Sequence, residues 1–229
     1  MSKRISTFFI IILCAAFRAS GAEQTCAFVN ALDAGKKQTL VVYGTSLTAG
    51  GAWVKQLQEK FNEKYPGLLT IVNGAASGMN SSWGAQNVES HVVAKKPDAV
   101  LIEFGINDAV QRFNLSKDDC RANVTKILDT IQKGLPQCEM ILMTMNCVAG
   151  ENGAKRGGQL PEYYQIYRDI AKERKLLLID HYVNWKAIQD KSPKNFDNLV
   201  TDGVHPTPAA CKQVIIPEFE RVFNLSIKR

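Results

Sequence analysis

The chain has 229 residues and a formal net charge of +6, with 45% hydrophobic and 22% charged residues. This balance excludes a disordered chain, which would have fewer apolar residues and more net charge for its length. The 16 glycines and 8 prolines follow no fixed period, which excludes a collagen-like repeat. We therefore expect a globular protein with its own hydrophobic core.

Residues 1–22 have the pattern of a secretory signal peptide. Lys3 and Arg4 precede an unbroken apolar run of ten residues, 8–17, and the small residues Ser20 and Ala22 follow. The alternative is an uncleaved membrane anchor, but a helix of this length spans only about half of a roughly 30 Å hydrocarbon core. The sequence predicts cleavage before Glu23, a secreted or periplasmic protein, and no stable membrane anchor after cleavage.

Cleavage changes the charge and the cysteine count. The segment 1–22 carries three basic residues and no acidic one, so its loss lowers the net charge from +6 to +3. A charge this small gives no reason to expect a nucleic-acid partner. Five cysteines remain, an odd number that predicts at least one thiol unpaired within the chain: Cys26, Cys120, Cys138, Cys147 and Cys211. Their spacing matches no metal-site pattern, and we expect no metal.

Short apolar runs alternate with segments of helical periodicity through the rest of the chain. Strands are predicted at Thr39–Tyr43, Leu69–Val72, Ala99–Phe104, Met140–Met145 and Leu176–Ile179. Helices are predicted at 52–65, at 88–94, from Ser116 to Gly134, after Pro161 and after Thr207. A polar, glycine-rich loop is predicted at 146–159, and another polar stretch, 190–203, precedes the last helix.

This alternation predicts an α/β fold. Short apolar strands separated by helices indicate a parallel sheet covered on both faces, and right-handed crossovers make it a three-layer α/β/α sandwich with a five-stranded parallel sheet. No linker or repeat divides residues 23–229, so we expect a single domain. Sites in such sheets form beyond the carboxyl ends of the strands. That rule selects the segments 44–51, 73–78, 105–108 and 146–159.

Two of these segments carry side chains suited to acyl transfer. Ser46 lies two residues after a glycine that ends the first strand, where a hydroxyl can be exposed and the N–H groups of a helix start can stabilise negative charge. Asn107 follows the third strand and can offer its side-chain N–H₂ to a developing oxyanion. The alternatives are a serine that only caps a helix and an asparagine that only forms an Asx turn.

A third group of residues lies just before the last predicted helix. Asp202 precedes His205 by three residues, and Pro206 favours an extended backbone at the histidine. An aspartate so placed can hold an imidazole in one tautomer and stabilise its protonated form. The alternative is an ordinary surface turn.

Taken together and in this order, these segments resemble the SGNH, or GDSL, hydrolase superfamily over essentially the whole chain after the signal. The family's first block, Gly-Asp-Ser-Leu, corresponds to 44–47, its second to Asn73 with Ser77-Gly78, its third to 105–108 and its last to 202–206. The resemblance implies a flavodoxin-like fold and the following site residues: Ser46 as nucleophile, Asp202 and His205 as its partners, and Ser46, Gly78 and Asn107 as oxyanion donors. Gly74 is a less favoured donor than Gly78.

The chain departs from the family pattern at Thr45, where the first block has Asp. We expect the catalytic set to survive this change and the hydrogen bonds of the turn to differ. His181, at the end of the last predicted strand, is the rival for the role of base, but no spacing supports it as well as that of His205. Glu103 and Asp108 are predicted to be structural.

Substrate contacts are less defined. Trp83 could stack on a sugar or simply pack at a helix start, and Lys155 and Arg156 could contact an anionic saccharide or be solvated. The resemblance implies a secreted serine esterase that works through an acyl-enzyme on Ser46 and needs no cofactor or metal. Export, polar loops and the absence of a long apolar insertion favour a short acyl group, most simply acetyl on a carbohydrate. A lysophospholipase or acyl-thioesterase and a catalytically silent carbohydrate-binding relative are the alternatives, and the oligomeric state stays open.

Overall fold

A computed structural model of the protein describes residues 26–225, so the predicted signal peptide at 1–22 lies outside the described residues. The strands are β1 Gln38–Gly44, β2 Leu69–Asn73, β3 Ala99–Glu103, β4 Glu139–Thr144 and β5 Leu177–Asp180. They form one sheet in the order β2-β1-β3-β4-β5, and every neighbouring pair is parallel. The predicted five-stranded parallel sheet is confirmed.

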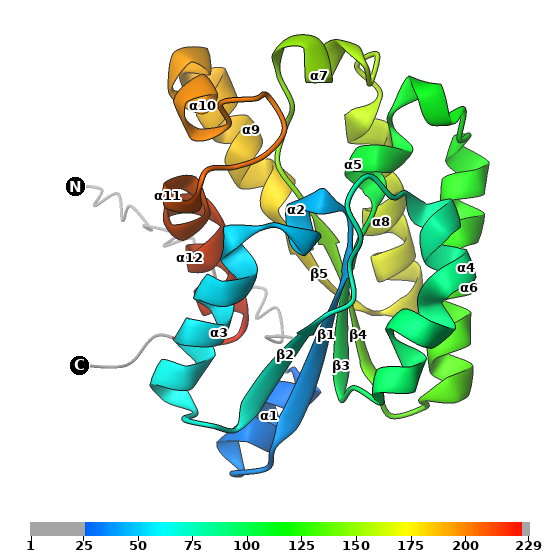
Figure 1. Ribbon diagram of the computed structural model, residues 1–229, viewed down its shortest axis with the longest axis vertical. Coiled ribbons are helices and arrows are strands. Elements are labelled where there is room, and N and C mark those ends of the chain that lie inside the picture. The colour runs from blue at the N-terminus through cyan, green and yellow to red at the C-terminus, as the bar shows by residue number, and fades with distance from the viewer. Residues whose placement is uncertain (1–25, 226–229) are drawn as a thin grey trace, which may run out of the picture.

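Helices cover both faces of this sheet. The longer ones are α1 Ala27–Asp33, α3 Ala52–Lys64, α4 Ser81–His91, α6 Lys117–Gly134, α8 Leu160–Arg174, α9 His181–Lys191, α10 Pro193–Leu199 and α12 Ile216–Val222. The short ones are α2 Ser46–Ala49, α5 Gly105–Asp108, α7 Gly150–Ala154, α11 Pro208–Ala210, η1 Val93–Lys95, η2 Gln111–Phe113 and the π-helical turn η3 Cys211–Ile215. Figure 1 shows α4, α6 and α8 on one side of the strands and α3 and α12 on the other, which confirms the three layers.

Three segments differ from their predictions. Helix α4 begins at Ser81, well before 88, because Asn80 caps it by accepting a hydrogen bond from the Trp83 N–H. The loop predicted at 146–159 contains helix α7, and the polar stretch 190–203 is largely helical. There the Ser192 side chain caps α10, and the buried residues of this helix, Phe196 and Leu199, are too few to produce a clear periodic pattern.

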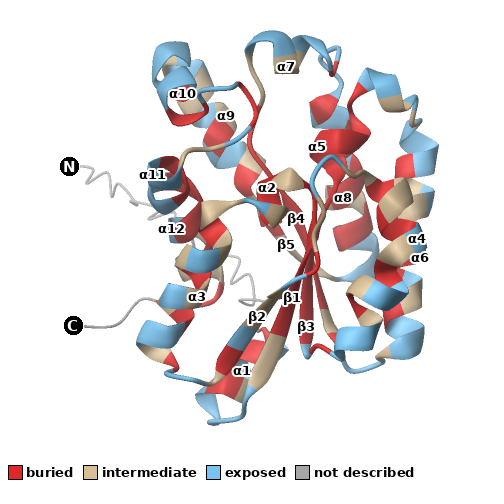
Figure 2. Cartoon of the chain, in the orientation of Figure 1, coloured by how far each residue is buried: buried red, intermediate tan, exposed pale blue. Residues whose placement is uncertain are grey.

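The core lies between the strands and the two helical layers, as the burial colours show (Figure 2). All five residues of β3 are buried, and so is Trp53 on α3. The five cysteines in residues 26–225 are buried and none forms a disulfide, in agreement with the prediction of at least one unpaired thiol. Within the same residues, no helix combines the length and the apolarity needed to cross a membrane.

The strand order places the site. The chain leaves β1 towards β2 on one side and returns to β3 on the other, so the connections after β1 and β3 diverge and open a crevice at their carboxyl ends. Gly44, the last residue of β1, is in register with Glu103, the last of β3. The turns that follow carry Ser46 and Asn107, and the topology therefore brings them to the same end of the sheet.

Candidate active site

The turn that carries Ser46 rests on a buried carboxylate. Glu103 accepts hydrogen bonds from the Thr45 N–H (2.7 Å) and from the hydroxyls of Thr45 and Thr48 (3.0 and 2.7 Å). A Cβ on Gly44 would lie 2.3 Å from Glu103 Oε1, so only glycine allows this approach. Burial raises the pKa of Glu103 to about 7, although the hydrogen bonds act to lower it. The Thr45 hydroxyl thus anchors the turn to Glu103 by donating a hydrogen bond, which the side chain of an ionised aspartate could not do.

Asp202 and His205 meet Ser46 in a continuous chain of hydrogen bonds. His205 Nε2 lies 2.9 Å from Ser46 Oγ, and His205 Nδ1 lies 2.6 Å from Asp202 Oδ2. The other carboxylate oxygen accepts the N–H groups of Val204 and His205. Partial burial acts to raise the pKa of Asp202, but these hydrogen bonds outweigh it and lower the pKa. The carboxylate is therefore ionised, and it holds the imidazole with Nε2 facing the serine.

Gly78 and Asn107 line the same pocket of about 490 Å³ as Ser46 and His205. Gly78 has a φ of +77°, a conformation that favours glycine. Asn107 is 8% exposed and donates from Nδ2 to the Met79 carbonyl at 2.8 Å. Gly74, the less favoured donor, is buried and its N–H already donates to the Val42 carbonyl.

Asp108 anchors α5, the helix that carries Asn107, to residues near the start of α4 and to α6. It accepts from the Ser81 N–H at 2.7 Å and from Cys120 Sγ at 3.1 Å, and burial raises its pKa to about 6. Asn107 and Asp108 therefore join α5 to residues 79 and 81 at the start of α4. As predicted, Glu103 and Asp108 have structural positions away from Ser46 Oγ and His205.

The segment after β4 supports the turn that carries Asp202 and His205. Asn146 Nδ2 donates to the Val204 carbonyl at 2.8 Å, and Asn152 Nδ2 donates to the Asp202 carbonyl at 2.7 Å. A Cβ on Gly203 would lie 2.4 Å from the Ala149 carbonyl oxygen, so the two segments are in close contact there. The sequence analysis selected this segment as a place for the site, but it did not identify Asn146 or Asn152.

Two rival residues lie away from the pocket. Trp83 packs against Tyr43, Phe104 and His91, with ring centroids 4.8 Å apart for the last pair, and it does not line the Ser46 pocket. Trp83 is half-buried and packs against the core near the start of α4, which corresponds to the alternative of packing at a helix start. His181 is fully buried against Phe219, and burial lowers its pKa to about 4.

The two basic residues of the loop after β4 have different environments. Lys155 is exposed at the rim of the Ser46 pocket and pairs with Glu151 at 2.8 Å. Arg156 is only 4% exposed, so it is not solvated, and its side chain reaches Asn107. No pattern in the sequence indicated its burial, because the contacts that bury it come from α5 and from the other side of its own loop.

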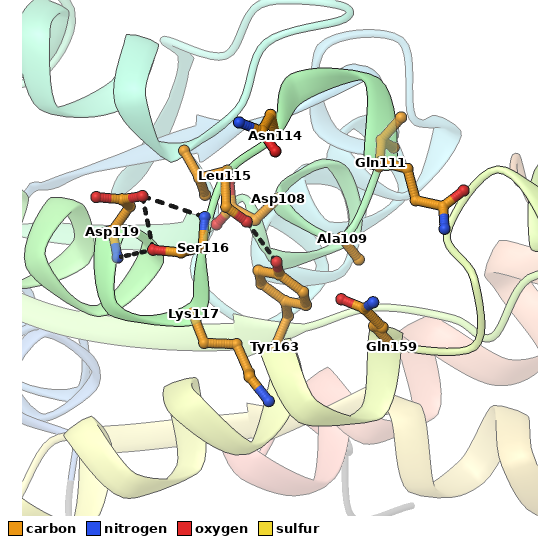
Figure 3. Close-up of a pocket in the computed structure, with 11 residues that line it drawn as sticks. Asp108, Ala109, Gln111, Asn114, Leu115, Ser116, Lys117, Asp119, Gln159 and Tyr163 are labelled. Carbon is orange, nitrogen blue, oxygen red and sulfur yellow. Dashed lines mark hydrogen bonds between the residues drawn. The ribbon is translucent and has the colours of Figure 1, made fainter.

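A second pocket of about 520 Å³ adjoins the first, with Val110 and Gln111 lining both. Its other walls come from the start of α6 and from the region of Gln159 and Tyr163. Figure 3 shows the Gln111 and Gln159 side chains on the same side of this pocket, and the Tyr163 hydroxyl donating to the Leu115 carbonyl. The pocket therefore offers amide groups next to the Ser46 site.

Comparison with known proteins identifies relatives over most of the chain. A model of the GDSL-like lipase/acylhydrolase family matches residues 42–212. An arylesterase of Vibrio mimicus is 25% identical over 193 residues, which is 80% of this chain and 86% of the relative. A thioesterase 1/protease 1/lysophospholipase L1 of Escherichia coli is 23% identical over 198 residues, which is 86% of this chain and 82% of the relative.

Among solved structures, an acetylxylan esterase from Geobacillus stearothermophilus superposes with a TM-score of 0.72 at 22% identity, over 85% of this chain and 98% of that one. Catalytic mutants of that enzyme replace a serine, an aspartate and a histidine. The structural likeness establishes that the two chains share a fold.

Proposed function

Since the chain belongs to the GDSL-like lipase/acylhydrolase family and is a serine ester hydrolase, we propose that Ser46 is its nucleophile and His205 its general base. The observation that carries this proposal is the hydrogen-bond chain from Ser46 Oγ through the His205 ring to Asp202, at 2.9 and 2.6 Å. Asp202 orients the imidazole and stabilises its protonated form, and no cofactor is required.

In the proposed reaction, His205 Nε2 takes the hydroxyl proton as Ser46 Oγ attacks the ester carbonyl. The tetrahedral intermediate collapses, His205 gives the proton to the leaving oxygen, and an acyl group remains on Ser46. Water then attacks the acyl-enzyme with His205 again as base. The oxyanion is stabilised by the N–H groups of Ser46 and Gly78 and by the Asn107 amide.

For the substrate, we propose a short acyl group, most simply acetyl, on a carbohydrate. The Ser46 pocket is open and has Gln111, Arg112 and Lys155 among its lining residues. The adjoining pocket adds the amides of Gln111 and Gln159, which suit sugar hydroxyls. The name of the acetylxylan esterase that shares the fold is consistent with this substrate class.

A lysophospholipase or acyl-thioesterase is the second candidate, because the E. coli relative carries both activities in its name. Such a substrate needs room for a long acyl chain, whereas the described lining of the Ser46 pocket has Val110 and Val204 as its only aliphatic side chains. The silent carbohydrate-binding alternative does not fit a serine ester hydrolase.

A chain-length series of aryl esters, run beside acetate release from acetylated oligosaccharides, tests the substrate proposal. We expect the highest kcat/KM with C2 or C4 esters, and a Ser46→Ala variant that folds but is inactive on all of them. Gln159→Ala should raise KM for acetylated oligosaccharides and leave aryl acetate hydrolysis unchanged. A preference for C8 or longer esters would overturn the carbohydrate proposal in favour of the second candidate.

We also propose that the protein is exported, by cleavage after Ala22. The support is the sequence pattern of residues 1–22. Expression of the full chain in a bacterial host, followed by fractionation and N-terminal sequencing, should give an extracytoplasmic protein that begins at Glu23. A protein that keeps Met1 or Ser2 and stays inside the cell would contradict export.

A further inference from the structure

Arg156 is a buried cation without an acidic partner. Its side chain donates to three oxygens: the Ile106 carbonyl from Nε at 2.8 Å, the Asn152 carbonyl from Nη1 at 2.7 Å, and Asn107 Oδ1 from Nη2 at 3.4 Å. None of the ion pairs formed within residues 26–225 includes it. A guanidinium stays protonated, and burying it among neutral acceptors alone is costly. Its retention in the wall of the Ser46 pocket therefore calls for a function.

The contact with Asn107 determines which way that amide faces. Asn107 Oδ1 accepts from Arg156, and Asn107 Nδ2 donates one of its two N–H groups to the Met79 carbonyl. If the amide were reversed, its N–H₂ would face the guanidinium N–H and its oxygen would face the Met79 oxygen, and both contacts would be repulsive. Arg156 and Met79 thus fix the orientation that leaves the second N–H free to serve the pocket.

Arg156 also connects the two sides of the site. Asn152, whose carbonyl accepts from Arg156, donates its side-chain N–H₂ to the Asp202 carbonyl. A path of three hydrogen bonds therefore runs from Asn107 through Arg156 and Asn152 to the turn that carries Asp202 and His205. The distance between the oxyanion donor and the base is set in part by this one side chain.

We propose that Arg156 is a positioning residue for the oxyanion hole: it fixes the Asn107 amide, and the anionic charge that develops on the substrate carbonyl oxygen is the counter-ion that its buried guanidinium lacks. The inference rests on the proposed function, in which Asn107 is an oxyanion donor. It predicts that Arg156 acts on the transition state rather than on substrate binding, because only the transition state carries that negative charge.

The first test compares Arg156→Met, which removes the charge and the donors, with Arg156→Lys, which keeps the charge. Lys194→Met, which removes an exposed cation on α10 that lines neither pocket, is the matched control. With a neutral aryl acetate, we expect Arg156→Met to lower kcat by about 10- to 100-fold with KM nearly unchanged. This is less than the loss of an oxyanion donor itself, about 10²–10³-fold, because Arg156 acts through Asn107. Arg156→Lys should recover part of kcat, and Lys194→Met should match the wild type. A higher KM with kcat unchanged would overturn the inference.

The second test separates positioning from a general structural role. Alkylboronic acids add to a serine hydroxyl to form an anionic tetrahedral adduct, so their affinity should fall in Arg156→Met by the same factor as kcat/KM. In the Asn107→Ala background, Arg156→Met should have a smaller effect on kcat than in the wild type, because the amide it positions is gone. Boronate affinity that stays unchanged, or effects that multiply fully, would contradict the inference.

The outcomes also separate this inference from the proposed function. If Asn107→Ala keeps full activity, the oxyanion assignment itself fails. If Asn107→Ala is impaired and Arg156→Met is not, only the inference about Arg156 fails. Circular dichroism and the unfolding midpoint check that each variant folds. If Arg156→Met does not fold, kcat and boronate affinity of Arg156→Lys carry the test, and values equal to those of Lys194→Met would overturn positioning by the guanidinium fork.

Discussion

Ser46 and Asn107 stand on turns anchored from within the protein, whereas Asp202 and His205 lie on an exposed turn. Glu103 and Asp108, which hold the first pair of turns, are 2% and 1% exposed. The side chains of Asp202 and His205 are 51% and 47% exposed. We call the turns of Ser46 and Asn107, together with the carboxyl groups of Glu103 and Asp108, the buried region. It depends on contacts between distant parts of the chain. On the exposed turn, the Asp202 and His205 side chains contact each other, and the segment after β4 supports the backbone of the turn.

The comparison predicts that substitutions in the two regions have different effects on stability and activity. Removing a group from the buried region leaves donors or acceptors without partners away from water, so both stability and activity should fall. Removing the imidazole from the exposed turn leaves its surroundings solvated, so activity alone should fall. Each of the following predictions tests this difference.

The largest effect is expected for His205→Ala. Loss of the general base should lower kcat on an aryl acetate by a factor on the order of 10⁴–10⁶, because Ser46 is then no longer activated. The free energy of unfolding should change by no more than about 0.5 kcal/mol, as for other exposed positions. Steady-state kinetics and urea unfolding check the two values. Destabilisation of several kcal/mol would mean that the exposed turn supports the fold and that the comparison fails.

Asn107 belongs to the buried region and should show both kinds of loss. Asn107→Ala is expected to lower kcat by about 10²–10³-fold, and to lower the free energy of unfolding by about 1–3 kcal/mol because Met79 and Arg156 lose their partner.

Asn107→Asp separates the two effects, since its carboxylate can pair with Arg156 but repels an oxyanion. It should be more stable than Asn107→Ala and no more active. An Asn107→Asp enzyme with substantial activity would contradict the assignment of the amide as an oxyanion donor.

The same difference explains what could be predicted from the sequence. Ser46, Gly78, Asn107 and the Asp202–His205 pair each lie within a short motif at the end of a strand or before a helix, so local pattern and fold class were enough to place them together. Arg156 and Trp83 could not be placed in this way. The burial of Arg156 depends on α5 and Asn152, and the packing of Trp83 depends on where α4 begins, which no local motif specifies.

Glu103 predicts a pH dependence for the buried region. Its pKa in the folded protein, about 7, lies above the ordinary value of 4.5, so the folded state keeps a proton that the unfolded state loses between these values. The contribution of Glu103 to stability is therefore full below about pH 4.5, declines as the pH rises to about 7, and is constant above it. Glu103→Gln removes this dependence.

Urea unfolding of both proteins from pH 4.5 to 8 measures the effect. The stability of the wild type relative to Glu103→Gln should decline by up to roughly 3 kcal/mol as the pH rises. Titration of Asp108 occurs in both proteins and cancels in the difference. Glu89→Gln, an exposed change on α4, should give a curve parallel to that of the wild type. Parallel curves for Glu103→Gln would show that the buried carboxyl group does not hold its proton.

The smallest effect is expected for Trp83→Phe, which tests where the buried region ends and the substrate site begins. The Trp83 ring contacts His91, Tyr43 and Phe104, so its replacement should cost about 1 kcal/mol of stability through lost packing. KM for an acetylated oligosaccharide should stay within about 2-fold of the wild type, because the ring packs against the core and does not line the Ser46 pocket. Gln159→Ala, on the wall of the adjoining pocket, is the comparison variant, and its KM should rise on the same substrate. A KM that rises in Trp83→Phe for the oligosaccharide but not for an aryl acetate would return this tryptophan to the substrate site, and it would mean that α4 moves when the sugar binds.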